Sequence, residues 1–187
     1  MSFTFRKMAI PDVLVVEPAV FKDGRGFFAE LYKFPDFEKN GIATPWLQVN
    51  CSKSDKNILR GLHYQKAPMA QAKLIRVTAG KIFDVAVDIR KGSPFYGKSV
   101  SIELSAEDLK LLYIPEGFAH GFCVTSQVAE VTYYTSNVYS PTHEKGILYS
   151  DPKLQINWPV KKPALSIKDA QLPTLALADN NFIYAQK

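Results

Sequence analysis

The sequence has few of the residues that mark secreted, membrane-embedded or metal-rich proteins. Its 187 residues include only two cysteines, Cys51 and Cys123, and three histidines. Two cysteines without a close-spaced partner exclude a disulfide framework and a cysteine-based zinc site. No apolar run approaches the roughly 20 residues of a membrane-spanning helix, and the first residues lack the long apolar stretch of a signal peptide. We therefore expect a cytoplasmic protein with two free thiols and no membrane partner.

Positive charge is in modest excess and is not gathered in one place. The 23 lysines and arginines exceed the 18 aspartates and glutamates, which gives a net charge of +5. Nucleic-acid-binding proteins usually collect such charge into a run or stripe, whereas the densest basic pair here is Lys161 and Lys162. This scatter argues against a nucleic-acid partner. It fits either a small anionic ligand, such as a phosphate ester, or a charge that only keeps the protein soluble.

Prolines and glycines leave little room for long helices. The 12 prolines and 10 glycines break the chain into short segments, which is typical of an all-β sandwich or barrel. The length fits about one domain, and no repeat, low-complexity tract or linker divides residues 1–187. We expect a single all-β domain, with the part after Asp151 wrapped around it as loops and short helices.

Alternating apolar side chains predict the strands. In residues 81–90 the odd positions are mainly apolar and share one face, whereas Asp84 and Asp88 fall on the other. Further strands are predicted over residues 13–18, 73–78, 99–104, 118–124 and 128–139. Helical signals are brief: residues 35–40 could form one or two turns, and residues 105–108 resemble a capping box.

A polar cluster stands within apolar sequence at residues 58–65 (ILRGLHYQ). A histidine is the side chain best suited to move a proton at neutral pH, which His63 could do, and Arg60 could hold a phosphate or carboxylate through paired N–H bonds. Strict alternation would place these two side chains on opposite faces of a strand. Gly61 could supply a bulge that turns both toward one cavity. The alternative interpretation of His63 is a hydrogen-bonded core histidine.

A second cluster, residues 114–122 (IPEGFAHGF), places a turn before His120. A Pro-x-Gly turn followed by a histidine resembles the second motif of the cupin superfamily, in which that histidine binds a metal. The first cupin motif needs two histidines spaced by one residue, and here His63 and Gln65 stand in that place. Because a catalytic metal takes three or four N/O ligands, we expect none. A metal-dependent cupin oxygenase using His63 and His120 remains an alternative.

These motifs, taken with others in the same order, resemble the dTDP-4-dehydrorhamnose 3,5-epimerase family. The similarity runs from about residue 10 to residue 169 and rests on residues 23–30 (DGRGFFAE), 48–50 (QVN), 59–65 (LRGLHYQ), 71–74 (QAKL), 83–90 (FDVAVDIR), 93–94 (SP) and 114–122, on Tyr133 and Tyr139, and on residues 165–169 (LSIKD). Gly24 replaces an acidic residue expected before the arginine, and Asn57 stands where glycine is common. Neither position carries chemistry.

The resemblance implies a cupin-like double-stranded β-helix, or jelly roll, with short peripheral helices and no cofactor. It implies epimerisation at C3 and C5 of a dTDP-4-dehydro sugar in dTDP-L-rhamnose biosynthesis, where the C4 ketone acidifies both neighbouring C–H bonds. By the same resemblance His63 is the base, paired with Asp169, and Tyr133 is the acid on the opposite face of the ring. Lys73 would stabilise the enolate oxygen as a fixed positive charge.

The resemblance also assigns residues to binding of the dTDP-sugar substrate. Arg25, Arg60 and Lys168 would neutralise the diphosphate, and Phe27 would stack on thymine. The other positions it assigns are Glu30, Gln48 and Asn50 for the base or deoxyribose, His120 and Glu144 for the sugar or its phosphate neighbourhood, Asp84 near the base or the lysine, and Tyr139 for the wall of the sugar pocket.

A homodimer with strand exchange is expected as well. The edges of a β-sandwich pair promiscuously if left open, and a partner's strands often cover them. The strand predicted at residues 13–18 is the candidate for exchange, an arrangement that the resemblance also implies. Residues 25–30 would then complete the nucleotide pocket of the other subunit.

Two further alternatives remain open. A relative with the same fold could epimerise only C3 or only C5, or isomerise the ketosugar, although an acid at Tyr133 favours epimerisation at both centres. A non-catalytic sugar-binding module would need no base, acid and enolate-stabilising lysine together. Deuterium entry at C3 and C5 in heavy water separates these cases, and activity after chelation tests the metal-dependent alternative.

Overall fold

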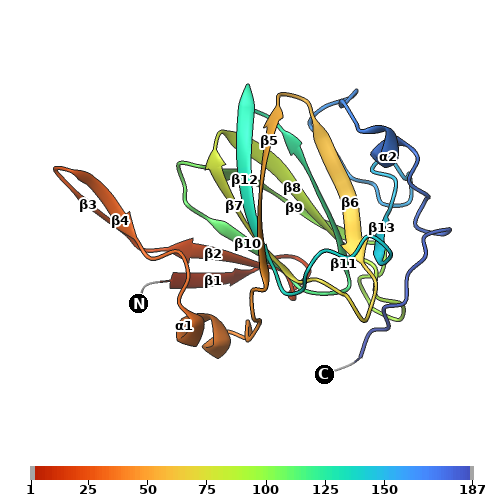
Figure 1. Ribbon diagram of the computed structural model, residues 1–187, viewed down its shortest axis with the longest axis horizontal. Helices are drawn as coiled ribbons and strands as arrows, with labels where there is room; N and C mark the ends of the chain where they lie inside the picture. Colours follow the sequence, from red (N-terminus) through yellow and green to blue (C-terminus); the bar gives the residue numbers. More distant parts are fainter. Residues whose placement is uncertain (1–2, 186–187) are drawn as a thin grey trace.

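The computed structural model describes residues 3–185 and consists almost entirely of antiparallel strands joined by loops (Figure 1). The strands are β1 (Phe3–Lys7), β2 (Leu14–Pro18), β3 (Val20–Asp23), β4 (Gly26–Ala29), β5 (Gln48–Asp55), β6 (Leu59–Gln65), β7 (Lys73–Ala79), β8 (Lys81–Asp88), β9 (Ser99–Ser105), β10 (Leu111–Ile114), β11 (Phe118–Val124), β12 (Val128–Thr135) and β13 (Glu144–Gly146), and the helices are α1 (Phe34–Lys39) and α2 (Ile167–Ala170). Within residues 3–185, no helix is long and apolar enough to cross a membrane.

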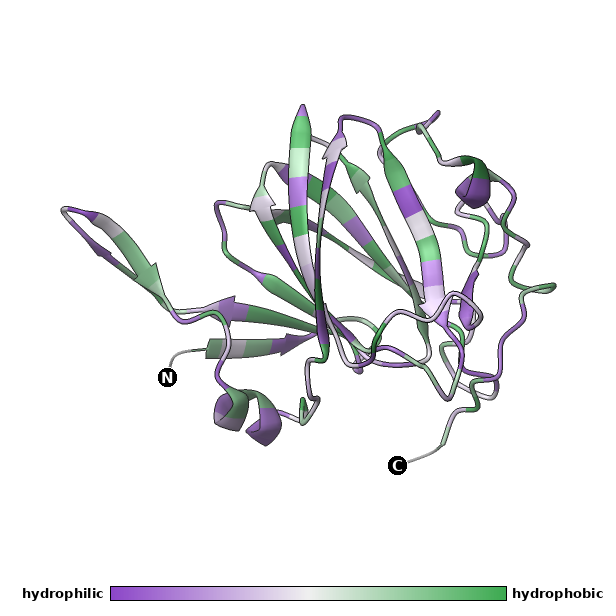
Figure 2. Ribbon diagram, viewed as in Figure 1, coloured by the Kyte–Doolittle hydropathy of each residue, from purple (hydrophilic) through white to green (hydrophobic). Residues whose placement is uncertain are grey.

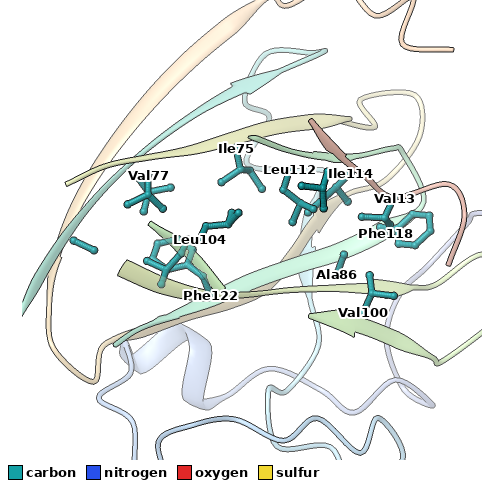
Figure 3. Close-up of a cluster of buried hydrophobic side chains, with 14 of the residues drawn as sticks. Val13, Ile75, Val77, Ala86, Val100, Leu104, Leu112, Ile114, Phe118 and Phe122 are labelled. Carbon is teal, nitrogen blue, oxygen red and sulfur yellow. The ribbon is translucent and has the colours of Figure 1, made fainter. Parts of the chain in front are cut away.

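Two sheets pack face to face around the main core. One has six strands in the order β1-β2-β10-β7-β12-β5, and the other has five in the order β13-β6-β11-β8-β9. Figure 3 shows apolar side chains of both sheets meeting between them, such as Ile75 and Leu112 from the first and Leu104 and Phe122 from the second. The predicted all-β sandwich is confirmed, with its core between the sheets.

Each sheet also has a covered outer face. Phe37 of α1 packs with Leu74 and Leu111 on the six-stranded sheet, and the segment after Asp151 packs against the five-stranded sheet through residues such as Leu154. This segment contains only the short α2 and loops, as predicted. Strand β8 is buried on both faces. The face that carries Asp84 is the inner one, which lies beside the core between the sheets.

The strand predictions over residues 73–78, 81–90, 99–104 and 118–124 are confirmed by β7, β8, β9 and β11. Two local predictions were wrong. The strand predicted over residues 128–139 ends at Thr135, after which the chain turns over the sheet edge. The capping-box segment forms only a turn, in which the Asp108 N–H donates to Ser105 Oγ at 3.3 Å. The chain then enters β10, which pairs with β2 and β7, so sheet pairing outweighs the helical signal.

A two-stranded hairpin, β3 and β4, projects from the body (Figure 1) and pairs with no other strand of residues 3–185. Its aromatic residues Phe21, Phe27 and Phe28 are 59%, 60% and 65% exposed, and Figure 2 colours β4 as largely hydrophobic. The strand predicted for exchange, residues 13–18, is instead β2, which is bonded on both edges by β1 and β10. The exposed segment suited to contact another chain is therefore the hairpin.

Candidate active site

A bulge in β6 turns two polar side chains into one cavity. In the register of β6 with β11, His63 faces His120 and Arg60 faces Phe122. The partners are thus three residues apart on β6 but two residues apart on β11, which marks a β-bulge. Gly61 sits in the bulge with φ of +128°, and a Cβ there would lie 2.5 Å from the Cα of Gly121. Only glycine fits such an approach. Arg60 and His63 consequently line the same cavity, as predicted.

The cavity lies between the sheets and has two lobes, of about 450 Å³ and 270 Å³. Both lobes are lined by His63, Lys73 and Tyr133. His63 comes from β6 of the five-stranded sheet, whereas Lys73 and Tyr133 come from β7 and β12 of the six-stranded sheet. The histidine and the tyrosine therefore stand on facing walls, which suits groups that act on opposite faces of one ring.

His63 is held by the carboxylate of Asp169. The distance from His63 Nε2 to Asp169 Oδ1 is 2.8 Å, and the Gly61 N–H donates to Asp169 Oδ2 at 3.3 Å. Burial alone would raise the pKa of Asp169, but the hydrogen bond and charge of His63, together with the bonds from Gly61 and Ser166, outweigh it and hold this pKa below its usual value. Asp169 is therefore ionised at neutral pH and can orient the imidazole and stabilise its protonated form.

Burial shifts the pKa values of Lys73 and Tyr133. Lys73 is 8% exposed, and burial lowers the pKa of its ammonium to about 8, although Asp84 and Glu144 act in the opposite direction. Its Nζ donates to the backbone oxygen of His63 at 3.3 Å. Burial raises the pKa of Tyr133, which Arg60 partly offsets. At neutral pH the ammonium of Lys73 is thus charged and the phenol of Tyr133 is protonated, and both stand opposite His63.

A second histidine–aspartate pair lies beside the first. His120 Nε2 is 3.0 Å from both carboxylate oxygens of Asp84, which is completely buried. Burial lowers the pKa of His120, and the neighbouring Asp84 only partly offsets this. The buried carboxylate thus has the partner that such a group requires.

The mouth of the cavity is bridged by three side chains. Lys168 Nζ lies 2.5 Å from Glu144 Oε2, and the Tyr139 hydroxyl donates to the same oxygen at 2.6 Å. Burial would raise the pKa of Glu144, but its bonds to Lys168 and Tyr139 hold it below the usual value. Lys168 lines the larger lobe, whereas Tyr139 and Glu144 line the smaller one.

The inner face of β5 carries a row of polar side chains. Gln48 and Asn50 line the smaller lobe, and Gln48 Nε2 donates to Asn50 Oδ1 at 2.7 Å. Gln48 Oε1 also accepts from the Tyr139 N–H at 2.8 Å, which ties the segment after β12 to the cavity. Further along the strand, Ser54 Oγ accepts from Arg60 Nε at 2.9 Å and orients the guanidinium.

Gln65 occupies the place of the second histidine in a metal-binding cupin. It is 3% exposed, and its amide donates to the backbone oxygens of Met69 and Val138 and accepts from the Ser140 N–H. All of these bonds hold loops around the cavity. Among residues 3–185, no group of three or more histidine, cysteine, aspartate or glutamate side chains could hold a metal ion.

Four predicted binding residues do not line the cavity: Asp84, which is completely buried and bonded to His120, and three residues of the hairpin region. Arg25 and Phe27 lie on the projecting hairpin and Glu30 follows it, and none of them lines either lobe. Arg25 instead bonds to Asp23 at 2.7 Å with its side chain 92% exposed. Within one chain, the residues of the hairpin region stand apart from the other predicted site residues.

Two supporting residues were missed. Ser166 caps α2, where its Oγ accepts from the Asp169 N–H at 3.0 Å and so fixes the residue that holds His63. Its spacing to Asp169 is that of a capping box, a signal present in the sequence. Ser54, the partner of Arg60, carries no such signal. Asn57, where glycine is common, has φ of +67°, which asparagine tolerates better than most residues.

The fold and the site together define a class: an acid–base catalyst built between the two sheets of a jelly roll. The family model described as dTDP-4-dehydrorhamnose 3,5-epimerase matches residues 7–177. An enzyme of that name from Shigella flexneri is 56% identical over 164 residues, which cover 87% of this chain and 91% of the relative.

Solved structures agree with this match. An epimerase from Legionella pneumophila in complex with dTDP-4-keto-L-rhamnose superposes with a TM-score of 0.90 at 43% identity, covering 94% of each chain. A 3'-monoepimerase from Streptomyces bikiniensis in complex with dTDP-quinovose superposes with a TM-score of 0.85 at 33% identity, covering 91% of this chain and 87% of its own. The fold is the predicted cupin-like jelly roll, and the chain belongs to the dTDP-4-dehydrorhamnose 3,5-epimerase family.

Proposed function

We propose that this protein is an isomerase that epimerises C3 and C5 of dTDP-4-dehydro-6-deoxy-D-glucose, giving dTDP-4-dehydro-L-rhamnose in dTDP-L-rhamnose biosynthesis. Membership of the family supports the substrate and the reaction. The observation that carries the mechanism is the pairing of His63–Asp169 with Tyr133 on the facing wall of one cavity. Inversion of a carbon needs a base on one face and an acid on the other, and this cavity offers both.

The proposed chemistry uses three side chains. The imidazole of His63 removes a proton next to the C4 ketone, and Asp169 stabilises the imidazolium that forms. The charge moves to the ketone oxygen, where the buried ammonium of Lys73 stabilises the enolate more strongly than water does. Tyr133 returns a proton from the opposite face, since burial keeps its phenol protonated at neutral pH.

The nucleotide is proposed to occupy the mouth of the cavity. Arg60 and Lys168 line the larger lobe and are available to the diphosphate, and Gln48, Asn50 and Tyr139 line the smaller one. Lys168 is paired with Glu144, so the diphosphate would compete with Glu144 for the ammonium. His120 and Glu144 would bind on the sugar side.

We infer a homodimer in which the projecting hairpin of each chain reaches the cavity of the other. Phe27 is 60% exposed, and within residues 3–185 the side chain of Arg25 is paired only with Asp23. Strand β5 forms an edge of the six-stranded sheet, and its Val49 is 55% exposed. A hairpin docked near this edge would bring Arg25, Phe27 and Glu30 toward Gln48 and Asn50.

An enzyme that inverts only one centre is the second candidate, because a 3'-monoepimerase shares the fold. The placement of Tyr133 opposite His63 favours inversion at both centres. Incubation with dTDP-4-dehydro-6-deoxy-D-glucose in heavy water separates the two. We expect deuterium at both C3 and C5 by NMR, with activity unchanged by a chelator. Deuterium at one carbon alone would support the monoepimerase, and loss of activity on chelation would support a metal cupin.

A further inference from the structure

The C-terminal segment, residues 179–184, runs past β13 on the outside of the five-stranded sheet (Figure 1). It is fastened to the end of β8, since the Lys91 N–H donates to the Phe182 oxygen at 3.0 Å and the Tyr184 N–H donates to the Lys91 oxygen at 2.9 Å. The ring of Phe182 also packs on the apolar cluster that covers this sheet. The match of the family model ends at residue 177, before this segment.

Asp179 holds two lysines with one carboxylate. Lys66 Nζ lies 2.5 Å from its Oδ1, and Lys145 Nζ lies 3.6 Å from its Oδ2. The Tyr64 hydroxyl also donates to the Asp179 backbone oxygen at 2.9 Å. The bond from Lys66 and the charge of Lys145 hold the pKa of Asp179 below its usual value, so this carboxylate is ionised at neutral pH. Asp179 therefore ties the end of β6 to β13.

Asn181 fastens the residue that follows Lys66. Its Oδ1 accepts from the Ala67 N–H at 3.2 Å, and its Nδ2 donates to the Ala67 oxygen at 2.9 Å. These two bonds occupy both backbone groups of Ala67, as the opposite residue of an antiparallel strand would. Asp179 and Asn181 thus bind successive residues of the loop that leads from β6 to β7. Residues 179–181 are called the strap below.

The contacts of the strap lie directly behind one wall of the smaller lobe. Gln65 and Glu144 are paired across β6 and β13, and both line this lobe. Lys66 and Lys145 are the residues that follow them in the chain. Because side chains alternate along a strand, Glu144 projects into the cavity and Lys145 projects away from it, toward Asp179. In the described part of the chain, β13 has only three residues and pairs with β6 alone, so its backbone bonds hold this wall weakly.

We propose that the strap positions the wall of the smaller lobe, with Asp179 as the positioning residue. This inference rests on the proposed function, in which the smaller lobe binds part of the nucleotide. Asp179 fixes Lys145 and with it the adjacent Glu144. Glu144 in turn holds Tyr139 and Lys168 at the mouth of the cavity. No residue of the strap lines either lobe, so its loss should weaken binding and leave turnover at saturation near the wild-type value.

The test compares Asp179→Asn with the matched control Asp108→Asn. Asp108 is paired with Lys110 at 3.6 Å in a turn that lines neither lobe. Because exposed ion pairs are weak, Asp179→Asn should raise KM for the dTDP-sugar and the dissociation constant of dTDP by about threefold. The double variant Asp179→Asn/Asn181→Ala also loses the bonds to Ala67 and should raise both by about tenfold. The control should change neither.

A conservative variant separates positioning from a general effect on stability. Asp179→Glu keeps the charge and should restore KM toward the wild-type value, and the melting temperature is measured for each variant. A lower melting temperature with unchanged KM in the double variant would overturn the proposal. A rise in KM no larger than that of the control would also overturn it, as would a fall in kcat alone. Failure of the wild-type protein to convert the substrate would contradict the proposed function instead, whereas titration with dTDP tests the strap independently of turnover.

Discussion

The cavity and the β3–β4 hairpin both carry residues assigned to the substrate, but they differ in how complete they are. In the cavity, His63, Lys73 and Tyr133 are buried or half-buried, and His63 is held by Asp169. On the hairpin, Arg25 and Phe27 are exposed and contact no cavity group. Under the proposed function, one chain assembles the chemistry, whereas the binding residues assigned to the hairpin would need another molecule to cover them.

The difference follows from the packing of each region. The cavity side chains project from strands whose other residues fill a common core, so their positions are fixed by burial. The hairpin is a two-stranded ribbon, which is marginally stable on its own in water. Changes in the cavity should therefore alter the rate of chemistry, and changes in the hairpin should alter affinity.

The largest effect is expected from His63→Gln. Loss of a general base costs about 10² to 10⁴ in turnover, while affinity for dTDP should change little because the variant can keep its bond to Asp169. Steady-state kinetics and calorimetric titration with dTDP measure the two quantities. Turnover close to wild type would remove His63 from the chemistry.

Tyr133→Phe removes only a hydroxyl from the facing wall and should separate exchange from inversion. If Tyr133 returns the proton on the far face, deprotonation by the opposite wall continues, so solvent exchange should survive better than net epimerisation. Both rates can be measured in one NMR time course. A parallel fall in the two rates would argue against Tyr133 as the acid.

Arg25→Ala should weaken binding with little change in turnover at saturation. A hydrogen bond to a charged group contributes about 1.5–3 kcal/mol, which corresponds to roughly a 10- to 100-fold rise in KM. The matched control is Arg6→Ala, which removes another exposed arginine paired only with Glu17. An effect of Arg25→Ala no larger than that of the control would leave the hairpin without a role in binding.

The smallest effect is a pH dependence set by Lys73. Its pKa is lowered from 10.5 to about 8 by burial, so the ammonium is present below pH 8 and is lost as the pH rises through this value. The rate should therefore fall by up to tenfold per pH unit on the alkaline side. The Lys73→Arg variant keeps its charge at high pH, so the fall in rate above pH 8 should disappear if the variant retains activity. A fall in rate with the same midpoint in both proteins would show that another group causes it.

The sequence predicted the interior of this molecule better than its exterior. Alternation located β7, β8, β9 and β11 because their side chains pack on a common core. The bulge at Gly61 was predicted because two functional side chains needed one face. The sequence did not predict the turn at residues 105–108 correctly, since pairing of β10 with two strands outweighs a local capping signal.

Contacts between side chains of different strands were the hardest to derive. Ser54 of β5 orients Arg60 of β6, and no pattern of spacing predicts such a contact. Residues 13–18 carry a strand signal, but that signal does not show whether the strand pairs within its own chain, as β2 does, or with another. Assignments that came from the family motifs, such as Asp169 beside His63, agree with the geometry although they lie more than 100 residues apart.

The most direct test of the contrast between cavity and hairpin mixes two impaired variants at a substrate concentration at which neither turns over measurably. Arg25→Ala, assayed well below its KM, is impaired in the hairpin, and His63→Gln is impaired in the cavity. If each hairpin completes the cavity of its partner, random reassortment into dimers should restore up to about a quarter of the wild-type sites, because half of the dimers are mixed and one of their two sites is intact. If each site is self-contained, or the protein is a fully active monomer in sedimentation, mixing should restore no activity and would contradict the account.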